Sequence, residues 1–369
     1  MEKKIIRCAV IGLGIMGKKY ALMLENNEIP SMTLSAVCCR SDQTAAWAKE
    51  HLNTDIFRGE DEMYSHGDLF DAVLIVTPHR QHPAMTIRAL QEGKHVMCDK
   101  PAGILMEDAE KMSSLAEEKN LVLGLMCHQR TFESHRKIKQ LLEENTIGEV
   151  TRVCMENTTF FRTRKYHASG TWRSSWKGEG GGALINQGYH LIDLWQYLFG
   201  VPQSLYACIP FGKGNDFQVD DEATLCMEYP GKMTGTFILS TIEGCGRNML
   251  EIIGTKGRIL LDDALHVTIF DQDVREYARN ADVSDRAGLQ ETTVSYPIQG
   301  QSQAYQIMLR NFCDAIVHGE PLIAPSREGV GALSIINAAY LSAWTEKKVH
   351  LPINMDLYRS YLKKHEEQE

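Results

Sequence analysis

The sequence lacks the cysteine arrangements that are typical of structural metal sites and disulfide frameworks. Its ten cysteines include one adjacent pair, Cys38 and Cys39, but no CxxC motif and no cysteine–histidine cluster with the spacing of zinc ligands. Scattered cysteines of this kind are typical of free, mostly buried thiols in a reducing compartment. We therefore expect no metal site, no disulfides and a cytoplasmic location.

Long hydrophobic runs and a positive charge balance are also missing. The strand-like opening segment is interrupted at Gly12 and Gly14, which makes it too short for a signal peptide or a membrane span, and no later stretch reaches membrane length. The formal net charge of −9 argues against nucleic acid or an anionic membrane as the main partner. We expect neither partner.

The composition is that of an ordinary globular protein, with 43% hydrophobic and 24% charged residues. A chain of 369 residues exceeds the usual size of a single core, so two domains are expected. No repeat, low-complexity run or flexible linker is evident, which indicates that the two domains are joined directly.

A glycine motif lies between an expected strand and an expected helix near the start of the chain. Ile5–Tyr20 reads IIRCAVIGLGIMGKKY. In such a motif Gly12 permits the tight turn, Gly14 lets a pyrophosphate approach the backbone, and Gly17 lets helix and strand pack closely. The first helical amides, at Ile15 and Met16, then face the phosphates. This pattern predicts a dinucleotide site.

The residues after the second strand leave the choice of cofactor open. The strand Thr33–Cys39 is followed by Arg40 and Ser41, and the first acid is Asp42. NAD-specific sites usually place an acid there, whereas an arginine and a hydroxyl suit the 2′-phosphate of NADP. Arg40 could instead stack on the adenine, and Asp42 could cap the following helix. Both NAD and NADP remain candidates.

Strands and helices continue to alternate up to about residue 127, which predicts a doubly wound parallel sheet. Ligands of such sheets lie beyond the carboxyl ends of the strands. The loops expected there begin with Thr77–Pro78, Asp99–Lys100 and Gln129–Arg130. Because Lys100 precedes Pro101, its backbone is held extended at a strand end. The expected strands are Ala72–Val76, His95–Cys98 and Leu121–Cys127, and the expected helices are Gln81–Gln91 and Met106–Lys119.

The stretch Gly180–Gly200 is expected to form a glycine entry followed by one helix, Ala183–Phe199. Asn186, His190 and Asp193 fall on one face of that helix. Glycines that let a ligand approach the backbone, beside a polar stripe with an imidazole, suggest a reaction floor. The competing interpretation is a histidine that only hydrogen-bonds within the core.

The rest of the second half is expected to form a sheet. Gly148–Phe161 reads as a strand, the region 205–270 as a series of short strands, Arg279–Thr292 as a polar loop, and Gln301–His318 and Arg327–Thr345 as helices. Between them, the loop Arg162–Lys177 mixes aromatic and basic residues: Tyr166, His167, Trp172, Arg173 and Trp176. We interpret it as the rim of a sugar site, with packing against a neighbouring subunit as the alternative.

These motifs together resemble the glucose–fructose oxidoreductase/inositol dehydrogenase (Gfo/Idh/MocA) family across essentially the whole chain. The matching stretches are GLGIMG at Gly12–Gly17, VTPHRQH at Val76–His82, DKP at Asp99–Pro101, TWR at Thr171–Arg173, Gly180–Gly200 and Tyr305–Leu333. The resemblance implies a Rossmann domain at 1–127 and a second α/β domain with a large open, mainly antiparallel sheet at 128–369. It also implies helices near 301–345 that pack toward the first domain, and a homo-oligomer, dimer or tetramer, formed through the sheet face.

The resemblance further implies NAD(P)-dependent hydride transfer to or from a secondary alcohol of a sugar, cyclitol or glycoside. Lys100 and His190 are then the proton-transfer residues. Asn186 replaces the family's usual acid, and an amide can orient a hydroxyl but cannot relay a proton. The expected substrate contacts are Lys100, Tyr166, His167, Asn186 and His190. The expected cofactor contacts are Gly12, Gly14, Ile15, Met16, Gly17, Arg40, Thr77, Pro78, His82, Asp99, Lys100, Gln129, Trp172 and Arg173.

Two other functions remain open at this point. One is glycoside cleavage, or another redox-neutral sugar reaction, in which a tightly bound NAD is recycled within each turnover. The other is a non-catalytic regulator that binds a dinucleotide. Retention of both Lys100 and His190 argues against the regulator, since a sensor needs no proton-transfer pair.

Overall fold

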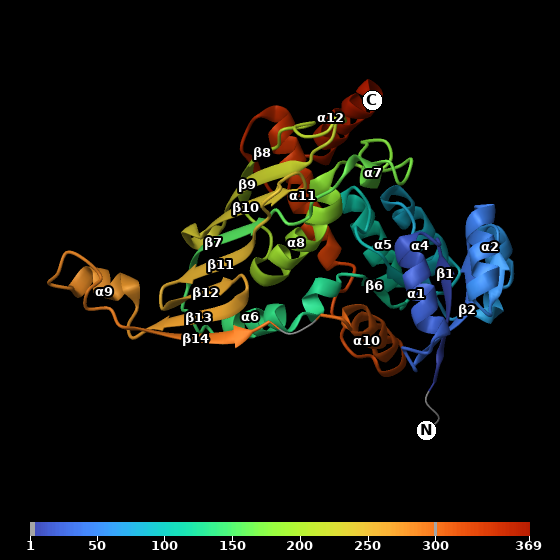
Figure 1. The fold of residues 1–369 in the computed structure, drawn as a ribbon, viewed down its shortest axis with the longest axis horizontal. Coiled ribbons are helices and arrows are strands. Elements are labelled where there is room, and N and C mark those ends of the chain that lie inside the picture. Colours follow the sequence, from blue (N-terminus) through green and yellow to red (C-terminus); the bar gives the residue numbers. More distant parts are fainter. Residues whose placement is uncertain (1–3, 299–300) are drawn as a thin grey trace. The chain divides into compact units, whose positions relative to one another are not determined.

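The computed structural model describes residues 4–298 and 301–369. The described chain forms two compact units (Figure 1). The first contains residues 4–131, 178–180 and 302–333, and the second contains residues 132–177, 181–298 and 334–369.

The first unit is built on a parallel sheet. Among the described residues it has six strands in the order β3-β2-β1-β4-β5-β6. This order confirms the expected doubly wound sheet, in which the strand order reverses beside β1 while all strands stay parallel. The strands are β1 (Ile6–Ile11), β2 (Met32–Cys38), β3 (Asp55–Phe57), β4 (Ala72–Ile75), β5 (His95–Cys98) and β6 (Leu123–Leu125).

Helices on both faces explain why these strands read as nearly continuous apolar runs. All four residues of β4 are buried, and in β1 only Arg7 is exposed. The helices of this unit are α1 (Ile15–Glu25), α2 (Asp42–His51), α3 (Glu60–Ser65), α4 (His82–Gln91), α5 (Met106–Glu118) and α10 (Ala304–His318), with short 3₁₀ turns η1 (Gly67–Leu69), η2 (His79–Gln81) and η3 (His128–Thr131).

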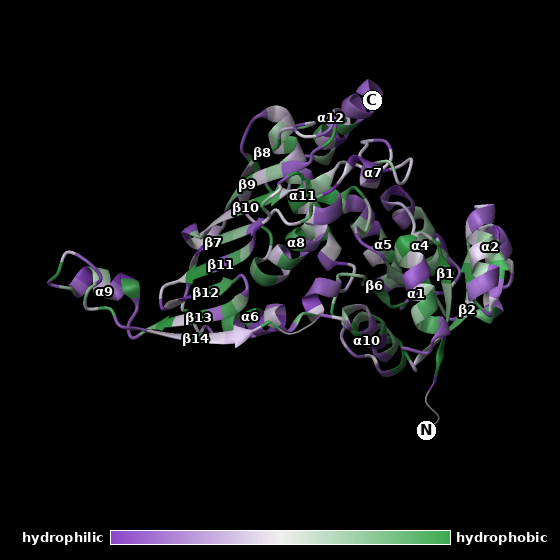
Figure 2. Ribbon diagram, viewed as in Figure 1, coloured by the Kyte–Doolittle hydropathy of each residue, from purple (hydrophilic) through white to green (hydrophobic). Residues whose placement is uncertain are grey.

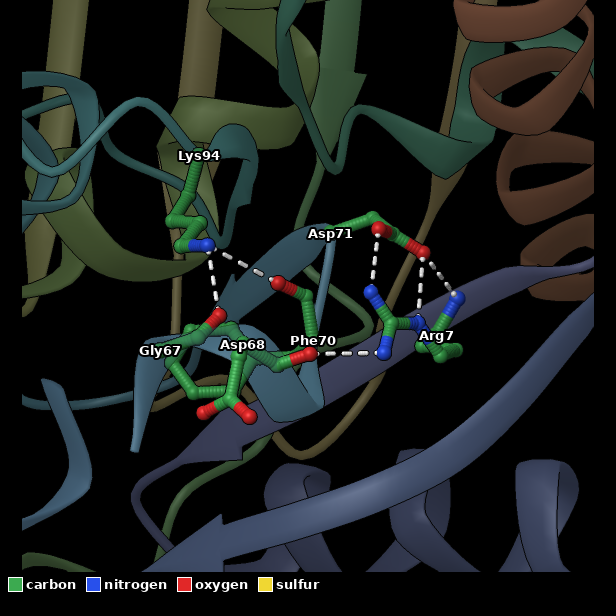
Figure 3. Close-up of polar contacts among 6 residues, drawn as sticks. All are labelled: Arg7, Gly67, Asp68, Phe70, Asp71 and Lys94. Carbon is green, nitrogen blue, oxygen red and sulfur yellow. Dashed lines mark hydrogen bonds and ion pairs between the residues drawn. The ribbon is translucent and has the colours of Figure 1, made fainter. Parts of the chain in front are cut away.

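Polar contacts hold the amino ends of β1 and β4 together (Figure 3). The Arg7 guanidinium donates to both carboxylate oxygens of Asp71, at 3.1 and 2.8 Å, and to the carbonyl oxygen of Asp68 at 2.6 Å. Nearby, the Lys94 ammonium donates to the carbonyl oxygens of Gly67 and Phe70 at 2.6 and 3.0 Å. Ligands of parallel sheets bind at the carboxyl ends of the strands. These charged groups lie at the opposite edge, so they stabilise the sheet and do not belong to a ligand site.

The segment 302–333 returns to the first unit through specific contacts. Tyr305 on α10 stacks on His128, with ring centroids 4.4 Å apart. Arg130, which is 1% exposed, forms an ion pair with Glu328 and donates to the carbonyl oxygen of Ile323 at 3.2 Å. The chain after β6 and the segment 302–333 therefore pack as one body.

The second unit is built on a large open sheet. Its nine strands, counted over the described residues, follow the order β14-β13-β12-β11-β7-β10-β9-β8-β15, and every neighbouring pair except β7 and β10 is antiparallel. This confirms the expected open, mainly antiparallel sheet. The strands are β7 (Val150–Asn157), β8 (Ser204–Cys208), β9 (Glu222–Glu228), β10 (Thr234–Ser240), β11 (Asn248–Gly254), β12 (Gly257–Leu261), β13 (Ala264–Phe270), β14 (Glu291–Pro297) and β15 (Val349–His350).

One long apolar helix, α8 (Ala183–Phe199), packs against β9 and β10. Figure 2 shows α8 largely in hydrophobic colours, whereas α12 is largely hydrophilic. A Cβ at Gly235 on β10 would lie 2.4 Å from the Trp195 ring, so this glycine lets helix and sheet pack closely. The other helices are α6 (Glu133–Glu143), α7 (Arg164–His167), α9 (Val274–Asn280), α12 (Met355–Gln368) and α11 (Glu328–Thr345), within which the unit boundary falls, together with the 3₁₀ turn η4 (Pro230–Lys232).

The helix predicted over Ala183–Phe199 is confirmed at both ends, but the polar loop predicted over Arg279–Thr292 is too long. Its first two residues end α9, which Asp273 caps by accepting from the Arg275 amide at 2.9 Å. Its last two residues begin β14, whose side chains are all exposed. In β14 the alternating apolar residues Val294 and Tyr296 come after Glu291 and Thr292, the two polar residues that the loop prediction covers.

None of the helices in the described part of the chain is both long enough and apolar enough to span a membrane. None of the ten cysteines, all of which lie in the described residues, forms a disulfide, and six of them are buried.

Candidate active site

The turn between β1 and α1 combines tight packing with one open position. Gly12 has a φ of +93°, and a Cβ on it would lie 2.6 Å from the carbonyl oxygen of Val76. A Cβ on Gly17 would lie 1.8 Å from the carbonyl oxygen of Gly12. At Gly14, which precedes α1 and offers no side-chain cap, a Cβ would meet nothing within 4 Å. Gly12 and Gly17 therefore serve the packing of the protein itself, while Gly14 leaves space beside the helix amides.

That space fits a dinucleotide pyrophosphate. The first amides of α1, at Ile15 and Met16, have no partner within the helix, and the helix N-terminus carries partial positive charge. Ile15 is 76% exposed, so its own side chain does not fill the space. An anion there would be bound by the amides and would meet no Cβ at Gly14.

A cavity of about 370 Å³ opens beside the carboxyl ends of β2 and β4. It is lined by Arg40, Glu60, Arg80, Gln81, Ala84, Met85 and Arg88. Burial raises the pKa of Glu60, and the charges of Arg40 and Arg88 oppose that shift. The side chain of Arg88 donates to Asp61 and Glu92, each at 3.0 Å. Within the described chain the Arg40 guanidinium has no hydrogen bond and no ion pair, so it can bind an anion.

The acid that could compete with Arg40 is already engaged. Arg58 donates to the Asp42 carboxylate and to the Arg40 carbonyl oxygen, both at 2.7 Å. Asp42 does not cap α2, because the Ser41 hydroxyl accepts from the Thr44 amide at 3.2 Å. The position where NAD-specific proteins usually place an acid is thus occupied by Arg40 and a capping serine.

At the carboxyl end of β5, a carboxylate supports the backbone of Lys100. The Asp99 Oδ1 atom accepts from the Lys100 amide at 2.8 Å. Burial raises the pKa of the Asp99 carboxyl, and the nearby charges of Lys100 and His82 act in the opposite direction. His82, at the start of α4, is 1% exposed and lies 2.7 Å from the carbonyl oxygens of both Thr77 and Pro101.

In the second unit, a buried carboxylate caps the helix that carries Asn186 and His190. Asp220 Oδ1 accepts from the Gly182 amide at 2.9 Å and from the Tyr340 hydroxyl at 2.7 Å. Its other oxygen accepts from the Leu184 amide at 2.6 Å. Burial raises the pKa of Asp220, and these three hydrogen bonds oppose the shift. The negative charge at the N-terminus of α8 favours the helix.

The glycines before α8 leave room for protein groups instead of forming the open ligand entry expected from the sequence. A Cβ on Gly181 would lie 2.2 Å from the Tyr340 hydroxyl oxygen, and one on Gly182 would lie 2.0 Å from the Asp220 carbonyl oxygen. That expectation is therefore wrong for these two positions. Their small size lets Asp220 and Tyr340 reach the helix end.

The Tyr166 hydroxyl connects the loop before α8 with the helix itself. It accepts from Arg173 and Gln187 at 2.9 Å each, and the Asn186 amide nitrogen lies 3.5 Å away. The Arg173 guanidinium also lies over the Trp172 ring at 4.5 Å. Tyr166, Trp172, Arg173 and Asn186, all predicted from the sequence, thus form one polar cluster.

Two other residues of this loop lie outside the cluster. His167 Nδ1 lies 2.5 Å from the Ser174 hydroxyl, within the loop. Trp176, which the sequence placed among the rim residues, is fully buried against Tyr340 and Trp344. It is a core residue, because its large apolar ring is stabilised more by burial than by a place on an exposed rim.

Comparison with known proteins identifies the family. A family model described as an oxidoreductase family with an NAD-binding Rossmann fold matches residues 6–126, and one described as a GFO/IDH/MocA C-terminal domain matches residues 135–260. The chain belongs to the Gfo/Idh/MocA oxidoreductase family.

Several relatives of this Gfo/Idh/MocA protein are dehydrogenases. The trans-1,2-dihydrobenzene-1,2-diol dehydrogenase of Bos taurus is 25% identical over 264 residues, covering 70% of this chain and 74% of the relative. The NADP(+) scyllo-inositol 2-dehydrogenase of Bacillus subtilis is 25% identical over 304 residues, covering 79% and 81%. The protein is therefore an oxidoreductase that acts on alcohol groups with NAD or NADP.

Solved structures share the fold of this Gfo/Idh/MocA chain. The WlbA dehydrogenase of Bordetella pertussis, solved with NADH and UDP-GlcNAcA, gives a TM-score of 0.79 at 20% identity, over 95% of this chain and 100% of that one. A levoglucosan dehydrogenase, solved with NADH and levoglucosan, gives a TM-score of 0.77 at 23% identity, over 94% and 100%.

Sequence reasoning missed several residues that shape these sites. Gln187 follows Asn186 directly and donates to the same Tyr166 hydroxyl. Its spacing from the other predicted site residues fits no motif, so the sequence did not reveal it. Glu60, Arg80 and Arg88 line the cavity beside Arg40; a signal for Arg80 was its place after the carboxyl end of β4. For Asp220 the sequence offers no signal, since 36 residues separate it from the Leu184 amide that it caps.

Proposed function

We propose that this enzyme is an NAD(P)-dependent dehydrogenase that oxidises, reversibly, a secondary alcohol of a sugar, cyclitol or glycoside. The observation that carries the proposal is Lys100 at the carboxyl end of β5, supported by the Asp99 carboxylate and in the same unit as the open glycine turn. Ligands of parallel sheets bind at this edge. The relatives named above act on diols and inositols, which are secondary alcohols.

In the proposed reaction the chain's own residues handle the proton. The bound nicotinamide would supply the hydride acceptor at its carbon 4. Lys100 or His190 takes the hydroxyl proton, and the Lys100 ammonium stabilises the alkoxide that develops. Asn186 orients the hydroxyl, because an amide donates and accepts hydrogen bonds without gaining or losing a proton. The Asp220 cap and the Tyr166 cluster hold Asn186 on its helix.

We further propose that the preferred cofactor is NADP. Within the described residues the Arg40 guanidinium forms no hydrogen bond and no ion pair, although the charge of Glu60 lies nearby, while Asp42 is engaged by Arg58. A guanidinium forms strong charge-assisted hydrogen bonds with a phosphate, and a 2′-phosphate is the group that distinguishes NADP from NAD at this position. Arg80 and Arg88 add positive charge to the same cavity, which Glu60 offsets in part.

The experiment is a panel of sugars, cyclitols and glycosides, followed by nicotinamide absorbance with NAD and with NADP and by analysis of the products. Stoichiometric reduction of added cofactor with at least one polyol supports the proposal. Release of an aglycone without net change in the cofactor would replace it with glycoside cleavage. Tight cofactor binding without turnover of any substrate would favour a regulator.

A homo-oligomer formed through the sheet face is also proposed. Large apolar side chains are exposed on its strands: Tyr206 is 45%, Val294 49% and Tyr296 39% exposed. Such residues are typical of interfaces. Light scattering at micromolar concentration should give the mass of a dimer or a larger assembly, and a monomer would contradict this. The cytoplasmic location stays a prediction from the sequence.

A further inference from the structure

His82 joins two loops that follow neighbouring strands of the parallel sheet. Its Nδ1 atom lies 2.7 Å from the carbonyl oxygen of Pro101, and its Nε2 atom lies 2.7 Å from that of Thr77. Thr77 follows β4, and Pro101 follows β5 and Lys100. Because the side chain is 1% exposed, water cannot readily replace either contact.

The two carbonyl contacts restrict how many hydrogen bonds the His82 ring donates in each protonation state. Carbonyl oxygens only accept hydrogen bonds, so a neutral imidazole donates to one of them and an imidazolium donates to both. Burial lowers the pKa of His82, the charge of Lys100 acts in the same direction, and the two carbonyls and Asp99 oppose them. His79, whose ring centroid is 6.2 Å away, is the other titratable group facing the ring. In either charge state at least one loop is held to the first turn of α4.

Lys100 depends on the loop that His82 holds. Its amide is fixed by Asp99 on one side, and the carbonyl of the following residue, Pro101, is held by His82 on the other. These two contacts constrain the backbone around the Cα atom from which the Lys100 side chain extends. A displacement of about 1 Å in a reacting group can cost about 10²-fold in rate.

We propose that His82 is a positioning residue that fixes the Lys100 amine by holding the carbonyl of Pro101, the residue after Lys100, to the first turn of α4. This assigns His82 a supporting role in place of the direct cofactor contact expected from its motif. The inference rests on the proposed role of Lys100 in proton transfer.

Two substitutions separate the contacts. In His82→Asn the amide nitrogen takes the place of Nδ1 and keeps the Pro101 contact, whereas in His82→Gln it takes the place of Nε2 and keeps the Thr77 contact. We expect His82→Gln to lower kcat by about 10- to 100-fold. His82→Asn should stay within about fivefold of the wild type, the effect of one hydrogen bond. A matched control is His95→Gln, since His95 is partly buried at the amino end of β5 and its Nδ1 accepts from the Val122 amide at 3.0 Å.

A second measurement uses the protein without cofactor or substrate. Competitive acylation across pH, read by mass spectrometry of the Lys100 peptide, gives the midpoint pH at which this amine becomes reactive. His82→Gln should shift that midpoint because it moves the amine relative to Asp99, and His82→Asn and His95→Gln should leave it in place. Unchanged acylation and kcat in His82→Gln would overturn the proposal. Equal losses in both His82 variants, with a parallel loss of thermal stability, would also overturn it.

The Lys100→Met variant distinguishes a failure of the proposed function from a failure of the role proposed for His82. Normal turnover in Lys100→Met would remove Lys100 from the reaction and refute the proposed function, whatever the acylation result. Inactive Lys100→Met together with normal His82→Gln would refute the role of His82 alone.

Discussion

The open position at Gly14 gives a test of the cofactor site that is separate from the test of the fold. Gly14 has φ −71° and ψ −165°, an extended backbone that alanine also adopts, and a Cβ there would meet no atom within 4 Å. Gly14→Ala should therefore leave the stability of the cofactor-free protein unchanged, or raise it by about 0.4–1 kcal/mol through the unfolded chain. The added methyl occupies the space assigned to the pyrophosphate.

The expected loss of affinity follows from crowding a packed contact. Forcing one extra carbon into such a contact costs about 1–3 kcal/mol. At about 1.4 kcal/mol for each factor of ten, Gly14→Ala should weaken dinucleotide binding by about 5- to 150-fold. A cofactor at 100 times its Kd stabilises the wild type by about 2.7 kcal/mol, and a tenfold weaker Kd removes about half of that.

The assay measures Kd by nicotinamide fluorescence and thermal unfolding with and without cofactor. Gly17→Ala is the matched control, because its Cβ would lie 1.8 Å from the Gly12 carbonyl oxygen and should lower the stability of the cofactor-free protein. If Gly14→Ala binds the dinucleotide within twofold of the wild type, the phosphates do not lie at this turn. If it unfolds as easily as Gly17→Ala, the position is not open.

Three further predictions concern the chemistry and the choice of cofactor. Lys100→Met should abolish turnover while changing cofactor Kd little, and near-normal single-turnover hydride transfer would exclude Lys100 from the mechanism. Arg40→Ala should weaken NADP binding by about 1.5–3 kcal/mol, about 10- to 150-fold, and NAD much less, because the lost contact is a hydrogen bond from a charged group. The control Arg88→Ala, whose guanidinium already pairs with two acids, should discriminate less, and equal losses of both cofactors in Arg40→Ala would show that Arg40 only stacks on the adenine. His190→Ala should slow hydride transfer by about 10²–10⁴-fold, whereas Asn186→Ala should cost less and act partly on substrate affinity. Asn186→Asp should shift the pH profile, and a wild-type rate in an easily unfolded His190→Ala would make His190 a core residue.

The sequence alone determined the features that depend on neighbouring residues. Apolar runs predict buried parallel strands, and three- and four-residue spacing predicts α8 at its observed ends. The Gly12–Gly17 motif predicts a phosphate turn, because the conformation of each glycine is set within a few residues of chain. The end of α9, at Arg279 and Asn280, and the start of β14, at Glu291 and Thr292, were assigned to a loop because these four residues are polar.

Only the tertiary structure decided how distant groups share polar contacts. Asp220 caps a helix that begins 37 residues before it. Residues 181 and 182 must be glycine because Tyr340 and Asp220 approach their Cα atoms too closely for a side chain. Trp176 belongs to the core and not to a rim, and His82 lies buried between two carbonyl oxygens instead of facing solvent. A buried polar group must find a partner, and that partner can come from any part of the chain that the fold brings within about 3 Å. A sequence shows which groups need partners, but only the folded chain shows which ones they have.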